Sequence, residues 1–153
     1  MKYWILSIVG HKRRRSKLKI TAPKKKKRKK STIDRELLKL WALAVKARAG
    51  FKCEFCGRTD RLNSHHIFGK RHRATRWDID NGICLCVGHH KLNQFSAHES
   101  PKFTEWIRRY IGIERYERIE KKAYSVKKWT DEEKEALKEE LKEYTKKIII
   151  EGR

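Results

Sequence analysis

The sequence predicts an α+β fold in which a short metal-stabilised sheet is flanked by helices. Three observations lead to this class. The chain has 153 residues, of which 38% are hydrophobic and 39% charged, so its core is small and benefits from a bound metal. Cys and His residues in closely spaced pairs bracket two short apolar segments near the centre. Helical spacing of apolar residues precedes and follows this central part.

The first half of the chain predicts one helix and two strands. The helix begins at Ser31 or Thr32, which can cap it, and ends at Gly50. Its apolar residues share one face: Leu37, Leu40, Trp41, Ala44 and Val45. Strands follow at 62–67 and 83–86, joined by a basic loop at 68–77. We expect a short helix to start near Gly88 and His89.

The second half predicts three helices. Ser100 and Pro101 open the first of these, and Gly112 ends it. A short helix follows, and Thr130 with Glu133 forms a capping box for the last one. We therefore divide the chain into a basic arm (1–30), a central domain with its neighbouring helices (31–112) and a C-terminal helical extension (113–153).

Positive charge is concentrated at the start of the chain. The net charge is +22, and residues 1–30 contain fourteen Lys or Arg and no acidic residue. Like charges repel, so we expect this arm to be largely disordered. A basic excess of this size usually indicates a nucleic-acid partner, although a solubility tail or a nuclear-import signal are alternatives. The residues expected to contact DNA are Lys24, Lys25, Lys26, Lys27 and Arg28.

The sequence does not predict a membrane protein. It has no stretch approaching the roughly eighteen apolar residues of a membrane-spanning helix, and the apolar residues 3–9 lack a signal-peptide cleavage site. We expect a cytoplasmic protein whose cysteines are reduced and free to bind metal. The oligomeric state stays open between monomer and homodimer.

Two pairs of residues have the spacing of zinc ligands. Cys53 and Cys56 form a C-x-x-C turn, and Cys86 and His89 supply a second pair with the same spacing. Zinc prefers four thiolate or imidazole ligands in a tetrahedron, so these residues predict one structural zinc ion. Cys84 is a competing ligand, because alternate residues of a strand face the same side.

A second group of histidines is not needed for this zinc site. His65 and His66 are adjacent and point to opposite faces of a strand, so one can bind a metal while the other acts as a general base. His90 directly follows His89 and can face away from it. Ordinary surface histidines are the alternative, and for His72 we expect a surface position.

The order of these residues resembles the HNH endonucleases. Their ββα-metal motif runs from a zinc knuckle through Asp/His-His and Asn to a C-x-x-C-H sequence. The matching residues here are Cys53-x-x-Cys56, His65-His66, Asn81 and Cys86-x-x-His89-His90. The resemblance covers residues 50–98, and the surrounding sequence resembles phage-encoded members near the lambda NinG group. It implies an HNH core stapled by zinc, and a bacterial or phage-infected cell as the setting.

The resemblance also implies a role for each residue. His65 and His90 bind the catalytic divalent metal, which is Mg²⁺, Mn²⁺ or Ni²⁺. His66 is the general base that activates water, and Asn81 ties the loop between the strands so that His66 is correctly aimed. His89 replaces the usual fourth cysteine of the zinc knuckle. The third catalytic ligand is open between Asn93, Gln94 and His98, of which His98 is favoured.

The predicted function is metal-dependent cleavage of DNA phosphodiester bonds. Arg71, Arg73 and Arg76 in the basic loop are expected to hold the flanking phosphates. One alternative is a structure-selective nuclease that acts on branched DNA, such as Holliday junctions, in phage recombination. Another is a non-catalytic zinc-containing DNA-binding module, for which His66 and His90 would be unnecessary. A ribosomal-type RNA-binding protein would leave the histidine pair unexplained.

Overall fold

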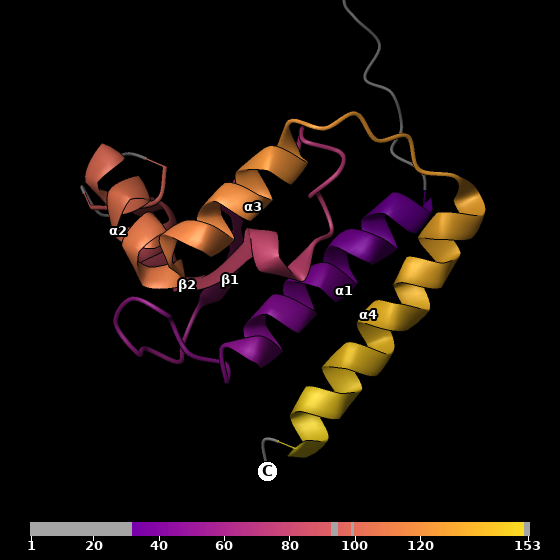
Figure 1. Ribbon diagram of the computed structural model, residues 1–153. Coiled ribbons are helices and arrows are strands. Elements are labelled where there is room, and N and C mark those ends of the chain that lie inside the picture. Colours follow the sequence, from indigo (N-terminus) through magenta and orange to yellow (C-terminus); the bar gives the residue numbers. More distant parts are fainter. Residues whose placement is uncertain (1–31, 93–94, 99, 152–153) are drawn as a thin grey trace, which may run out of the picture.

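The computed structural model describes residues 32–92, 95–98 and 100–151 (Figure 1). The predicted basic arm, with Lys24 to Arg28, lies outside these residues. The elements follow in the order α1 (Thr32–Arg48), β1 (Leu62–His66), the 3₁₀-helix η1 (Ile79–Asn81), β2 (Gly82–Cys86), the π-helix η2 (Gly88–Leu92), α2 (Pro101–Ile111), α3 (Ile113–Ala123) and α4 (Asp131–Glu151). The predicted α+β class is confirmed.

The sheet consists of β1 and β2, which pair antiparallel with His66 opposite Gly82. β1 ends one residue earlier than predicted, although the Ile67 N–H still donates to the carbonyl of Asn81 at 3.0 Å, because the chain opposite it has entered the 3₁₀-helix η1. β2 is buried along its whole length. Its residues Ile83 and Leu85 pack in one core cluster, whereas Cys84 packs in another. A two-stranded sheet is marginal alone, so packing on both faces is what stabilises it.

One side of the sheet is covered by α1, and α4 lies along α1 and runs in the same direction (Figure 1). Leu37 and Trp41 of α1 share a buried cluster with Leu141 of α4. Two ion pairs hold the helices in register, Asp34 with Lys134 at 3.3 Å and Glu36 with Lys138 at 3.2 Å. The C-terminal extension is thus packed against the first helix.

The predicted capping box at the start of α4 is confirmed. The backbone N–H of Thr130 donates to Glu133 Oε2 at 2.9 Å, and the N–H of Glu133 donates to Thr130 Oγ1 at 3.2 Å. These two bonds satisfy donors that the helix itself leaves unpaired. They fix the point at which the chain turns into α4.

The other side of the sheet is covered by α2, whose Phe103 and Ile107 pack with Ile83 and Leu85. Gly112, with φ of +84°, separates α2 from α3 as predicted. Ile119 and Ala123 of α3 then cover Phe68 in the loop between the strands.

None of the described helices is both long and apolar enough to cross a membrane.

Candidate metal centres

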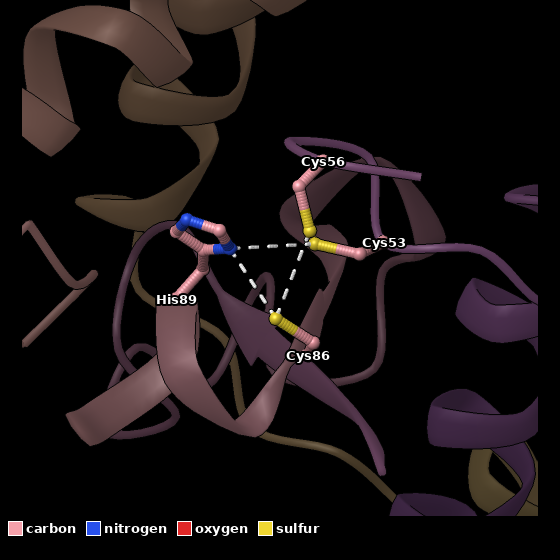
Figure 2. A group of neighbouring side chains, drawn as sticks. All are labelled: Cys53, Cys56, Cys86 and His89. Carbon is pink, nitrogen blue, oxygen red and sulfur yellow. Dashed lines mark hydrogen bonds between the residues drawn. The ribbon is translucent and has the colours of Figure 1, made fainter. Parts of the chain in front are cut away.

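Four of the predicted zinc ligands come together beside the end of β2 (Figure 2). Cys53 and Cys56 lie in the turn after α1, Cys86 ends β2, and His89 lies in η2. Their ligand atoms all lie within 4.8 Å of one another. His89 Nδ1 is 3.2 Å from Cys86 Sγ and 4.0 Å from Cys53 Sγ, and the Sγ atoms of Cys56 and Cys86 are 3.9 Å apart. A tetrahedral zinc ion requires ligand separations of about 3.5–3.8 Å, so this group can hold zinc.

Backbone geometry shapes the first half of this zinc cluster. The Cys53 N–H donates to the carbonyl of Arg58, and the Gly57 N–H donates to the carbonyl of Cys53, both at 2.8 Å. Gly57 has φ of +73°, which favours glycine at this position. The Glu54 N–H donates to the carbonyl of Cys84 at 2.8 Å, so the turn is fastened directly to β2.

The environment of Cys53 favours its thiolate form. Burial alone would raise the pKa of this thiol, but hydrogen bonds from the backbone at Cys86, Cys56 and Phe55 lower it overall. Burial raises the pKa of the Cys56 thiol, as does its proximity to Cys53. Thiolates are the form that binds zinc, and a cation at the centre stabilises both of them.

Cys84, the competing ligand, lies outside this group. It is fully buried and packs with Leu37, Trp41 and Trp77. Burial, followed by the nearby Glu54 carboxylate, raises the pKa of its thiol to about 12. Cys84 therefore stays protonated and acts as a small apolar core residue.

His65, His90 and His98 form a second group whose ligand nitrogens also lie within 4.8 Å of one another. The Nε2 atoms of His90 and His98 are 3.3 Å apart. The ring of His65 lies 5.3 Å from that of His90 and 4.9 Å from that of His98, between centroids. Of the three candidates for the last ligand, His98 joins the other two histidines, whereas Asn93 and Gln94 fall outside the described part of the chain.

His65 and His90 are electrically neutral at physiological pH. Burial, followed by the proximity of His90 and His98, lowers the pKa of His65 to about 3. Burial, followed by the proximity of His98 and Lys91, lowers the pKa of His90 to about 4. His90 Nδ1 is buried without a hydrogen-bond partner among the described residues. Neutral imidazoles that converge in this way are the form that coordinates a metal.

His66 lines the same pocket as this trio. Its Nε2 is 2.8 Å from the carbonyl oxygen of Arg76. A carbonyl only accepts hydrogen bonds, so Nε2 carries the hydrogen and Nδ1 of the neutral ring is the acceptor. Burial lowers the pKa of His66, although the bond to Arg76 works against this shift. The ring is thus neutral and has a free lone pair, as a general base requires.

Asn81 is fully buried and ties the loop between the strands. Its Oδ1 accepts from the Phe68 N–H at 2.7 Å, and its Nδ2 donates to the carbonyls of Phe68 at 2.9 Å and Thr75 at 3.0 Å. These three bonds all go to backbone groups of Phe68 and Thr75. The segment that they tie directly precedes Arg76, whose carbonyl accepts the hydrogen bond from His66. Asn81 therefore fixes the loop on which the orientation of His66 depends.

The three arginines of the loop make different contacts. Arg76 donates through Nε to the carbonyl of Lys70 at 2.8 Å and pairs with Asp34 at 3.7 Å. Arg71 donates to His72 Nε2 at 3.3 Å. Arg73 lines a small pocket together with Arg76 and Asp34. Arg76 therefore links the loop to α1.

Two lysines that the sequence analysis did not single out lie at the histidine pocket. Its volume is about 470 Å³, and within the described residues its lining includes Lys70 and Lys91 but none of the three loop arginines. The signal was present in the sequence, because Lys91 directly follows His90 and Lys70 lies four residues after His66. These lysines place positive charge beside the trio.

No protein-family model matches this chain, and no curated protein or solved structure is significantly similar to it. The two groups of possible metal ligands are therefore the features from which a function can be inferred.

Proposed function

We propose that this protein is a metal-dependent endonuclease of the HNH type that hydrolyses DNA phosphodiester bonds. The observation that carries the proposal is the histidine pocket. Three imidazoles converge there, and a fourth, His66, lines the same space with its Nδ1 as the acceptor nitrogen. The zinc cluster is separate and uses none of these four residues.

Each group has a defined part in the proposed reaction. His66 Nδ1 accepts a proton from water, and the resulting hydroxide attacks phosphorus. His65, His90 and His98 would hold the divalent metal, which neutralises the developing charge and stabilises the leaving oxygen. Departure of the 3′ oxygen leaves 3′-hydroxyl and 5′-phosphate ends. The ammonium groups of Lys70 and Lys91 are suited to hold the neighbouring phosphates.

The three-imidazole ligand set bears on the identity of the metal. Imidazole suits nickel and other late transition metals, whereas magnesium prefers carboxylates, carbonyls and water. Among the described residues the trio includes no carboxylate, and such a ligand set favours Ni²⁺ over Mg²⁺. The DNA-binding role of the basic arm belongs to the same proposal and is supported by its charge alone.

The test is incubation of the zinc-loaded protein with supercoiled plasmid, a four-way junction and single-stranded DNA. Each substrate is combined with Mg²⁺, Mn²⁺, Ni²⁺ or a chelator too weak to remove the zinc. We expect metal-dependent nicking, with product ends that a ligase can rejoin. Preferential cutting of the junction would favour the structure-selective nuclease.

A non-catalytic DNA-binding module is the second candidate, because the zinc cluster and the basic charge support it without the histidine pocket. It predicts tight DNA binding and no cleavage with any of the metals. The same incubation, with binding measured in parallel, separates the two functions.

A further inference from the structure

Helix α1 lies outside the segment that resembles the nuclease motif, yet it reaches the histidine proposed as the base. The indole of Trp41 stacks on the imidazole of His66, with ring centroids 3.7 Å apart and planes inclined by 15°. Trp41 is only 2% exposed, so it has no broad surface to offer a substrate. Its Nε1 donates a hydrogen bond to the carbonyl of Asp78 at 2.8 Å.

The position of Trp41 depends on a close approach between α1 and the sheet. Gly82 is the cross-strand partner of His66. A Cβ atom at Gly82 would lie 2.2 Å from Val45 Cγ2 and 3.0 Å from Trp41 Cζ2, so the glycine makes this approach possible. Arg48 then fastens the end of α1, donating to the carbonyls of Ile79 and Gly82 at 2.7 Å each.

Through Arg76, helix α1 is also linked to the Nε2 edge of the His66 ring. His66 Nε2 donates to the carbonyl of Arg76, and the Arg76 side chain pairs with Asp34 in the first turn of α1. α1 thus supports the face of the imidazole through Trp41 and its hydrogen-bonded edge through Arg76. Turning the ring out of its present plane would lose the stack on Trp41 and the bond to Arg76 together.

We propose that Trp41 is a positioning residue, which holds the His66 imidazole in one orientation and one tautomer. The proposal rests on the proposed role of His66 as the base. Trp41 does not touch the reacting atoms, so its loss lowers the rate of the chemical step and leaves DNA affinity unchanged. A displacement of about 1 Å in a reacting group costs on the order of a hundredfold in rate.

The variants for the test are Trp41→Met and Trp41→Phe. Methionine fills space in a core without offering a flat ring, whereas phenylalanine retains an aromatic face. Leu37→Ala is the matched control, because Leu37 is fully buried in the same cluster but is not part of the stack on His66. Zinc content and helical circular dichroism verify the fold of each variant.

Two readouts are measured on each protein, the cleavage rate at saturating DNA and metal, and the His66 tautomer from long-range ¹⁵N–¹H NMR. For Trp41→Met we expect a rate lower by about tenfold to a hundredfold and a mixture of His66 tautomers, with DNA affinity within twofold of wild type. Trp41→Phe should recover most of the rate and a single Nε2–H tautomer, and Leu37→Ala should match wild type in both.

In a His66→Ala background, Trp41→Met should cause no further loss of rate, since both changes act through the same ring. A full additional loss in that background would overturn the proposal. A single, unchanged His66 tautomer in Trp41→Met would also overturn the proposal, as would failure of that variant to fold. If the wild-type protein cleaves no substrate, the proposed function fails, while the tautomer comparison still decides the role of Trp41.

Discussion

At the scale of single residues, the bond between His66 and the Arg76 carbonyl decides what the imidazole can do. It places the hydrogen on Nε2 and leaves Nδ1 as the acceptor. His65, its neighbour in β1, belongs instead to the histidine trio that could hold a metal ion. Two adjacent histidines can therefore have different tasks while lining one pocket.

His98→Ala should weaken activation by the divalent metal without removing the structural zinc. It deletes one of three ligands, so the metal concentration that gives half-maximal cleavage should rise by at least about tenfold, since loss of even an outer-shell partner of a ligand costs roughly 10–100-fold. The measurement is a nickel titration of plasmid cleavage, with His72→Ala as the control histidine outside the pocket. An unchanged titration for His98→Ala would exclude it as a ligand.

The grouping of site residues was predictable where the sequence spacing alone brings their side chains together. The four zinc ligands follow from two x-x spacings, because each pair is held by one local turn. The environment of Arg76 was not predictable, because its contact with Asp34 joins residues 42 positions apart. The stack of Trp41 on His66 is hidden for the same reason, since helical periodicity identifies Trp41 only as a core residue.

At the scale of elements, the zinc cluster fastens the turn after α1 to β2 and η2 (Figure 2). The two-stranded sheet has little stability of its own. Structural zinc contributes binding energy of roughly 10–16 kcal/mol in small domains, which is comparable to the whole stability of a typical fold. The central segment should therefore depend on the ion.

Cys53→Ala should abolish tight zinc binding and lower the melting temperature by about 10 °C or more, because several kcal/mol are lost at roughly 2–4 °C per kcal/mol for a chain of this size. Zinc content after chelator washing and thermal circular dichroism provide the measurement. Cys84→Ala is the control, since it removes a buried thiol outside the cluster and should retain about one zinc per chain. A Cys53→Ala protein with full zinc and wild-type stability would contradict the assignment.

The helices and strands were predictable because each has a local signal. Apolar periodicity located α1, Pro101 and Gly112 bounded α2, and the capping box located the start of α4. The π-helical form of η2 carries no such signal. The parallel pairing of α4 with α1 depends on residues about a hundred positions apart, so only the structure reveals it.

At the scale of the whole molecule, positive charge is concentrated in residues 1–30, whereas both groups of possible metal ligands lie in the described part of the chain. The arm holds fourteen of the 41 Lys and Arg residues. Phosphate contacts supply affinity without sequence information. If the protein is the proposed nuclease, the arm would add affinity for DNA of any sequence.

Deletion of residues 1–30 should reduce the dependence of DNA affinity on salt. Each neutralised phosphate contributes roughly 0.9 to the slope of log affinity against log salt. If about five arm residues contact phosphates, the slope should become shallower by roughly four to five. Fluorescence anisotropy of residues 31–153 and the full chain across a salt series measures it, on two unrelated duplexes. An unchanged slope would make the arm a solubility or targeting segment.

The central claim is that His66 is the base of a metal-dependent nuclease. The most direct test compares initial rates of plasmid cleavage by wild type and His66→Ala, at saturating Ni²⁺ or Mn²⁺ and equal zinc content. Loss of a general base should lower the rate on the order of 10²–10⁴-fold, with DNA affinity, zinc content and metal activation unchanged. Cleavage by His66→Ala at the wild-type rate would contradict this account.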